Sequence, residues 1–165
     1  MSTIPAPLAR LIASVSDVPV ITEDLALYAT DVCYNAPNAA EALFCPRDEN
    51  DVVQLVSAAR DLGVGLYVRG GGLSYSSGYL PIRPGCALID LSGLDTIIEL
   101  NIADRYVTVQ PGVTWAALRE ALRPLSLTTP FWGTFSGRHA TIGASVSQGA
   151  KFFGSASRGS SAETV

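Results

Sequence analysis

The chain has 165 residues, of which 48% are hydrophobic and 16% charged, and its formal net charge is −4 at pH 7. This composition is typical of one globular domain with its own core, and it excludes a disordered chain. It also argues against nucleic acid as a partner, because Lys and Arg supply no surplus positive charge to neutralise phosphates.

The first part of the chain predicts helices that alternate with buried strands. A short helix over Pro7 to Ser14 is followed by an apolar strand over Ala42 to Cys45. The next helix has Asp48 as its N-cap and Gly63 just past its end, with apolar residues at helical spacing between them. Gly65 to Val68 predicts another strand. Strand, helix and strand in this order favour a βαβ unit with a parallel pair of strands.

The middle of the chain predicts a strand, a hairpin and a helix. Cys86 to Leu91 is an apolar run typical of a buried strand, and the hairpin that follows turns near Ala103 to Arg105. Thr114 is placed to cap a helix whose apolar residues lie on one face. These residues are Trp115, Leu118, Leu122 and Leu125. We therefore expect an α+β fold, with a parallel unit first and an antiparallel segment after it.

The last part of the chain combines glycines and hydroxyl residues with large apolar side chains. Those side chains are Phe131, Trp132, Phe135, Ile142, Val146, Phe152 and Phe153. They are too many for a solvated linker, so we expect an ordered, glycine-rich region whose apolar side chains are packed and not exposed to solvent. A short helix is predicted over Ile142 to Ser147.

The segment from Arg69 to Tyr75 places three consecutive glycines after a predicted strand, at the end of a parallel sheet where ligands bind. It is not a dinucleotide-binding fingerprint, because Tyr75 stands where the third glycine is needed, and it lacks the lysine of a P-loop. Successive small residues can instead aim backbone N–H groups at an anion, with Ser74 and Ser76 as further donors and Arg69 balancing charge. On this stretch alone, a tight turn that only reverses the chain is an equally good interpretation.

A second cluster of small and hydroxyl residues precedes the short helix near the C-terminus. It consists of Ser136, Gly137, Thr141, Ile142 and Gly143. The N-terminus of a helix presents free N–H groups, which form a site for an anion. Two such loops in one domain favour a ligand held along its length, with a pyrophosphate between them.

Three segments resemble, in the right order, landmarks of the FAD-binding domain of the vanillyl-alcohol oxidase/p-cresol methylhydroxylase (PCMH-type) superfamily. They are Arg69 to Tyr75, Val109 to Val113 and Ala140 to Gly143. The resemblance runs from about Glu41 to Val165. It implies one PCMH-type domain over residues 1–165 with two α+β lobes and FAD between them. The first lobe would span about 41–93, and the second would begin near 94 and stop incomplete at 165.

Carried over position by position, the resemblance implies a set of cofactor-binding residues. They are Arg69, Gly70, Gly71, Gly72, Leu73, Ser74, Tyr75, Pro111, Gly112, Ser136, Gly137, Thr141, Ile142, Gly143 and Gly149. The glycine loop would bind the FAD pyrophosphate through its backbone, and Pro111 and Gly112 would lie along the adenosine. The residues of the second loop would flank the pyrophosphate and the flavin.

The chain departs from the family pattern at two of these positions. Several members carry a histidine bonded covalently to the flavin where this chain has Leu73, so the resemblance implies noncovalent FAD at the glycine loop. Gly143 is followed by Ala144, where a second glycine is common. No catalytic residue is predicted, because His139, the single histidine, has no carboxylate or nucleophile at a recognisable spacing.

The function implied by the resemblance is that of an FAD-dependent oxidoreductase, an oxidase or a dehydrogenase. Such an enzyme passes a hydride from a substrate C–H bond to flavin N5, and its electrons then go to oxygen or another acceptor. A small-molecule substrate would be held by a cap domain that this chain lacks, so the isolated chain would be inactive. The alternative is a non-catalytic fragment or a split subunit that binds FAD only with a complementary chain or in an oligomer.

Cysteine usage and the absence of long apolar runs complete the expectations. Cys33, Cys45 and Cys86 are odd in number and far apart, which indicates free thiols in a reducing compartment and no zinc site. No apolar run approaches the ~20 residues of a membrane span, and the N-terminus lacks the features of a signal peptide. We therefore expect a cytoplasmic protein with no membrane span and no bound metal.

Overall fold

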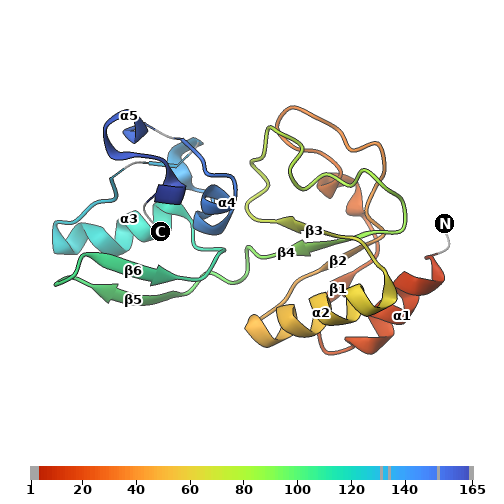
Figure 1. Ribbon diagram of the computed structural model, residues 1–165. Coiled ribbons are helices and arrows are strands. Elements are labelled where there is room, and N and C mark those ends of the chain that lie inside the picture. Colours follow the sequence, from red (N-terminus) through yellow and green to blue (C-terminus); the bar gives the residue numbers. More distant parts are fainter. Residues whose placement is uncertain (1–3, 131, 134, 152, 164–165) are drawn as a thin grey trace. The chain divides into compact units, whose positions relative to one another are not determined.

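The computed structural model describes residues 4–130, 132–133, 135–151 and 153–163. The chain forms two compact units, Met1–Gly93 and Leu94–Val165 (Figure 1). Each unit has its own cluster of buried apolar side chains. Among the described residues, no helix has the length and apolar character needed to cross a bilayer.

The first unit is built on a four-stranded sheet in the order β1-β2-β4-β3. Its strands are β1 (Val20–Ile21), β2 (Ala42–Phe44), β3 (Leu66–Arg69) and β4 (Ala87–Asp90). β4 pairs in parallel with both β2 and β3, whereas β1 is antiparallel to β2.

This order corrects one detail of the predicted βαβ unit. β2 and β3 run parallel, but β4 lies between them, so they are not neighbours. All four residues of β4 are buried, as a central strand covered on both faces requires. β3 is an edge strand, and its Val68 remains 55% exposed.

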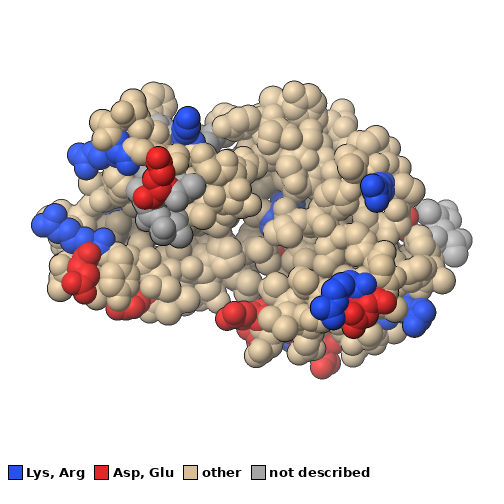
Figure 2. Space-filling model, in the orientation of Figure 1, with Lys and Arg blue, Asp and Glu red and all other residues tan. Residues whose placement is uncertain are grey.

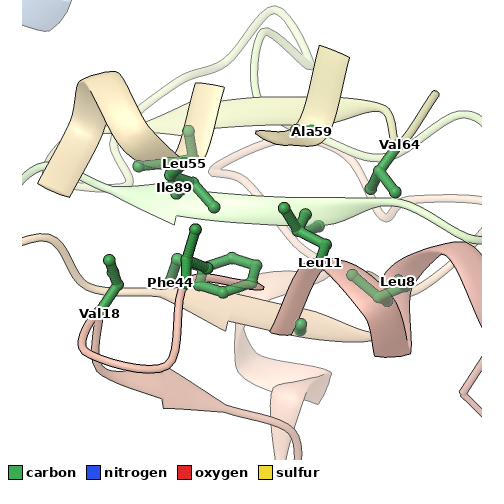
Figure 3. Close-up of a cluster of buried hydrophobic side chains, with 11 residues drawn as sticks. Leu8, Leu11, Val18, Phe44, Leu55, Ala59, Val64 and Ile89 are labelled. Carbon is green, nitrogen blue, oxygen red and sulfur yellow. The ribbon is translucent and has the colours of Figure 1, made fainter. Parts of the chain in front are cut away.

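Two helices pack against each other and against one face of the sheet: α1 (Ala6–Ser14) and α2 (Glu49–Leu62). The predicted caps of α2 are confirmed, because the Asp48 carboxylate accepts from the Asp51 amide and Gly63 has a φ of 68°. Phe44, Leu55 and Ile89 meet in the core that this packing closes (Figure 3).

The other face of the sheet is covered by the short helix η1 (Leu25–Tyr28) and by the loop that leads to β4. Side chains alternate between the two faces along each strand. Phe44 and Ile89 therefore belong to the helix side, whereas Leu43 and Leu88 pack with Tyr79 on the opposite side.

The second unit begins with the predicted hairpin, β5 (Ile97–Asn101) paired antiparallel with β6 (Tyr106–Val109). α3 (Trp115–Leu122) follows, and the Thr114 side chain caps it by accepting from the Ala117 amide. Its buried face packs on the hairpin (Figure 1). α4 (Ile142–Ser147) spans the residues predicted for it. The shorter elements are η2 (Arg123–Leu125), η3 (Phe135–Gly137), α5 (Ser155–Arg158) and η4 (Ser161–Glu163).

The packing expected of the C-terminal apolar residues is only partly present. The Trp132 ring is partly buried and lies 5.2 Å from the Arg119 guanidinium carbon. Phe135 and Phe153, in contrast, are 59% and 93% exposed. Phe131 and Phe152 lie outside the described residues. Charged side chains are scattered over the visible face and form no large basic patch (Figure 2).

The buried position of Phe44 generates a stability prediction. Replacing its ring by a methyl group in Phe44→Ala leaves a cavity between the sheet and the helices. We expect the variant to lose about 3–5 kcal/mol of unfolding free energy, measured by urea denaturation. Val53→Ala is the control, because Val53 lies on α2 with 58% of its surface exposed. Equal losses in the two variants would contradict this assignment of the core.

Candidate functional site

The glycine loop follows β3 directly, at the edge where the carboxyl ends of β3 and β4 meet. In the described part of the chain, the backbone amides of residues 70–75 donate no hydrogen bond. Most of these residues are only partly exposed, and Ser74 is buried. Backbone N–H groups shielded from water nearly always have an acceptor. A run of free amides at this edge of the sheet therefore fits an anion.

Gly72 requires the absence of a side chain for two reasons. It is the one glycine of the loop with a positive φ, 74°. A Cβ atom built on it would lie 2.3 Å from Nη2 of Arg69. Only glycine adopts this conformation without strain and leaves room for the guanidinium beneath. The close approach at Gly72 is thus to a side chain of the protein itself.

Arg69 is held below the loop by an ion pair and two aromatic rings. Its Nη1 lies 2.7 Å from Oδ2 of Asp90, and both side chains are less than a fifth exposed. The guanidinium carbon lies 5.0 Å from the Tyr28 ring centre and 5.6 Å from that of Tyr79. The charge of Arg69 is thus balanced by Asp90 within the protein. Its Nε is buried without a partner.

Asp31 bonds the chain just after the glycine loop, at Ser77, a role that the sequence did not predict. Its carboxylate accepts hydrogen bonds from the amides of Cys33, Tyr34 and Ser77 at 2.7–2.8 Å. Desolvation raises the pKa of Asp31, but these three bonds and one with the Ser74 hydroxyl outweigh it, so the pKa lies below its ordinary value. The local turn is a pattern typical of Asp. Its contact with Ser77, 46 residues away, has no sequence signal.

The Ser74 hydroxyl also serves the loop itself. Its Oγ accepts from the amides of Ser76 and Gly78, both at 3.2 Å. The Ser74 carbonyl accepts from the Val32 amide at 2.9 Å. Ser74 therefore holds the chain of the loop in place through both its hydroxyl and its carbonyl. Tyr75 is 52% exposed, and Leu73 is partly buried.

In the second unit, the two remaining landmarks pack against each other. The amide of Gly143 donates to the Pro111 carbonyl at 3.0 Å, and that of Ile142 donates to the Val113 carbonyl at 2.8 Å. A Cβ atom on Gly143 would lie 2.5 Å from Cβ of Pro111. Gly112 donates to the Leu94 carbonyl at 2.7 Å. The first two amides of α4, expected to be free, are therefore already bonded within the protein.

Among the described residues of the second unit, the hydroxyl of Thr141 is a buried group that lacks a hydrogen-bond partner. Thr141 is 2% exposed, its side chain makes no cap to α4, and its Oγ1 has no hydrogen-bond partner. A buried hydroxyl without a partner is better suited to bond a polar ligand group than the amides of Ile142 and Gly143, which are already bonded.

Two further glycines of the predicted site have structural roles. Gly137 has a φ of 69°, and a Cβ atom there would lie 2.7 Å from Cβ of Trp115. Gly149 has a φ of 55° and donates to the Val146 carbonyl after α4. The side chain of Ser136 lies outside the described residues. Within the described chain, no three His, Cys, Asp or Glu side chains gather as a metal site. His139 is exposed.

A family model for an FAD binding domain matches residues 40–165 of this chain. The mitochondrial cytochrome-linked D-lactate dehydrogenase of Kluyveromyces lactis is 34% identical over 110 residues, which are 62% of this chain and 19% of that protein. The chain spans less than a fifth of the length of the curated relatives it matches.

Solved structures agree with the predicted fold. Alkyldihydroxyacetonephosphate synthase matches with a TM-score of 0.80 at 17% identity, over 98% of this chain and 32% of that one. p-Cresol methylhydroxylase matches with a TM-score of 0.65 at 21% identity, over 81% and 27% of the two chains. At these identities the matches show the fold alone. The predicted α+β fold is confirmed.

The geometry at Gly72 predicts the effect of one added methyl group. In Gly72→Ala, the positive φ is strained and the new Cβ displaces the Arg69 guanidinium. We expect FAD to bind about tenfold more weakly, measured by quenching of flavin fluorescence. Gly93→Ala adds the same methyl group where nothing lies within 4 Å. If the two variants bind FAD equally, the loop does not depend on the conformation of Gly72.

The lowered pKa of Asp31 predicts a contribution to stability at acidic pH. This contribution is complete above the unfolded-state value of 3.8 and is lost as pH falls through the lower folded-state pKa. Asp31→Asn should lower the melting temperature at about pH 6 and reduce its further fall at about pH 3. Asp61→Asn is the control, because Asp61 is 66% exposed and bonds its neighbour Arg60. A pH profile of Asp31→Asn parallel to that of the wild type would refute this role.

Proposed function

This chain belongs to the FAD-binding domain family of the vanillyl-alcohol oxidase/p-cresol methylhydroxylase superfamily, and we propose that it binds FAD as part of a flavin-dependent oxidoreductase. The observation that carries the proposal is the run of backbone amides in residues 70–75 that have no acceptor among the described residues. A pyrophosphate has several acceptor oxygens close together, and successive N–H groups are suited to bind them without a lysine.

The charge state of the loop also favours this assignment. Asp90 neutralises Arg69, so the groups offered to a phosphate are amide dipoles and not a net cation. In the second unit taken by itself, the Thr141 hydroxyl is buried and has no hydrogen-bond partner among the described residues. Leu73 has a hydrocarbon side chain with no nucleophilic atom, so we propose that FAD is held noncovalently at this loop.

We assign the substrate to the 2-hydroxy acids, because the D-lactate dehydrogenase relative acts on a compound of this class. FAD, when bound, supplies the acceptor of a hydride from a substrate C–H bond. The residues described here would bind and orient the cofactor. We propose that a cap domain, on the same polypeptide or on a complementary chain, holds the substrate.

Anaerobic reduction tests the proposed function in the protein together with its proposed cap domain, whether that domain is on the same polypeptide or on a complementary chain. We expect D-lactate or glycolate to bleach the oxidised flavin absorbance, and acid precipitation of the same protein to release the flavin into the supernatant. Flavin that binds but stays oxidised with all 2-hydroxy acids tried would favour the non-catalytic alternative. A protein that binds no flavin would refute the proposal, and flavin retained in the pellet would refute its noncovalent part.

A further inference from the structure

Three alternate peptide carbonyls of the glycine loop accept hydrogen bonds from the protein beneath and beside it. The carbonyl of Gly70 accepts from Nη1 of Arg69 at 3.3 Å. The carbonyl of Gly72 accepts from the Tyr79 hydroxyl at 3.2 Å. The carbonyl of Ser74 accepts from the Val32 amide at 2.9 Å. The donors come from β3, from the loop before β4 and from the segment after η1, and all belong to the first unit.

These bonds fix the direction of the amides that follow. The chain contains no cis peptide bond in its described part, and in a planar trans peptide the C=O and the next N–H point in opposite directions. A carbonyl held toward the protein therefore turns the following amide away from it. The amides so directed are those of Gly71, Leu73 and Tyr75, and none of them donates to the described chain.

The two side-chain donors are themselves held in place. Tyr79 is 5% exposed, and its hydroxyl proton is shared between the carbonyl of Gly72 and that of Thr30, which lies at 2.6 Å. Burial raises the pKa of Tyr79, so the hydroxyl stays protonated and remains a donor. Arg69 is fixed by Asp90 and lies over the Tyr79 ring. One buried cluster thus holds two of the three carbonyls.

We propose that Arg69 and Tyr79 are positioning residues that orient the glycine loop, so that the amides of Gly71, Leu73 and Tyr75 face the phosphates of the cofactor. The inference rests on the proposed function. It differs from the expectation that Arg69 meets the ligand, because both residues act from behind the loop through its carbonyls.

Tyr79→Phe tests the inference with the loss of one hydroxyl. The ring remains in the core, but the Gly72 carbonyl loses its donor. We expect FAD to bind about fivefold more weakly in the full-length protein, the size expected for one lost hydrogen bond. The ³¹P NMR resonances of bound FAD should shift as well, since the amides around the phosphates move. Tyr67→Phe is the matched control, because Tyr67 packs against the same core cluster and its hydroxyl accepts from the amide of Ile82, which lies outside the loop.

A second variant acts on a different carbonyl. Arg69→Lys keeps the positive charge opposite Asp90 but removes the planar guanidinium, whose Nη1 donates both to Asp90 and to the Gly70 carbonyl. We expect weaker FAD binding and shifted ³¹P resonances here too. Wild-type affinity and resonances in this variant would show that Arg69 matters only as a charge, and would overturn its positioning role.

Melting temperatures separate this role from a general loss of stability. A structural role alone would change the melting temperature and leave the ³¹P resonances of the saturated protein at their wild-type positions. Equal affinity and equal resonances in Tyr79→Phe and Tyr67→Phe would overturn the inference while leaving FAD binding intact. A wild-type protein that does not bind FAD would instead remove the proposed function, and the inference with it.

Discussion

The glycine loop of the first unit is constrained by a run of backbone N–H groups that have no acceptor in the described chain. An N–H group without an acceptor costs free energy unless water or a ligand bonds it. The surrounding protein must therefore keep the loop from rearranging so that these amides bond a protein acceptor instead. Arg69, Tyr79 and Asp31 supply that hold, since each bonds the loop or its flanks from the protein side. Arg69 is the last residue of β3, Tyr79 lies in the loop before β4, and Asp31 lies in the segment after η1. The free amides are therefore a built feature of this fold and not a gap in its hydrogen bonding.

The Arg69–Asp90 pair explains how an acidic chain can present a site for an anion. Both side chains are largely buried, and removing two charges from water is favourable only when each finds close partners. Asp90 has Arg69 and the Ser92 amide, and Arg69 has Asp90, the Gly70 carbonyl and two aromatic rings. The pair is neutral as a whole. What the loop offers a phosphate is thus the dipoles of its amides, which agrees with a net charge of −4 and few basic residues.

Local features of this fold were predictable from the sequence, and long-range features were not. The Asp48 and Thr114 caps and the bounds of α4 follow from residue preferences within a few positions, and all three are confirmed. The place of β4 between β2 and β3 depends on pairing across distant segments, which periodicity does not encode. The hydrogen bond from the Ser77 amide to Asp31 joins residues 46 positions apart, and it was unpredictable for the same reason. Family resemblance located the loops, but not the contacts that hold them.

The landmarks after β3 and before α4 both contain glycine, but for different physical reasons. Gly72 lacks a side chain because the backbone turns to a positive φ over the Arg69 guanidinium, and the amides around it stay free. Gly143 lacks a side chain because Pro111 packs against it, and its amide donates a hydrogen bond to the Pro111 carbonyl. Small residues at a loop therefore do not by themselves indicate that a ligand approaches the backbone. The decisive observation is whether the N–H groups already have acceptors. By that measure the loop after β3 is the better suited of the two to bind an anion through its backbone, whereas the loop before α4 has the unpartnered Thr141 hydroxyl.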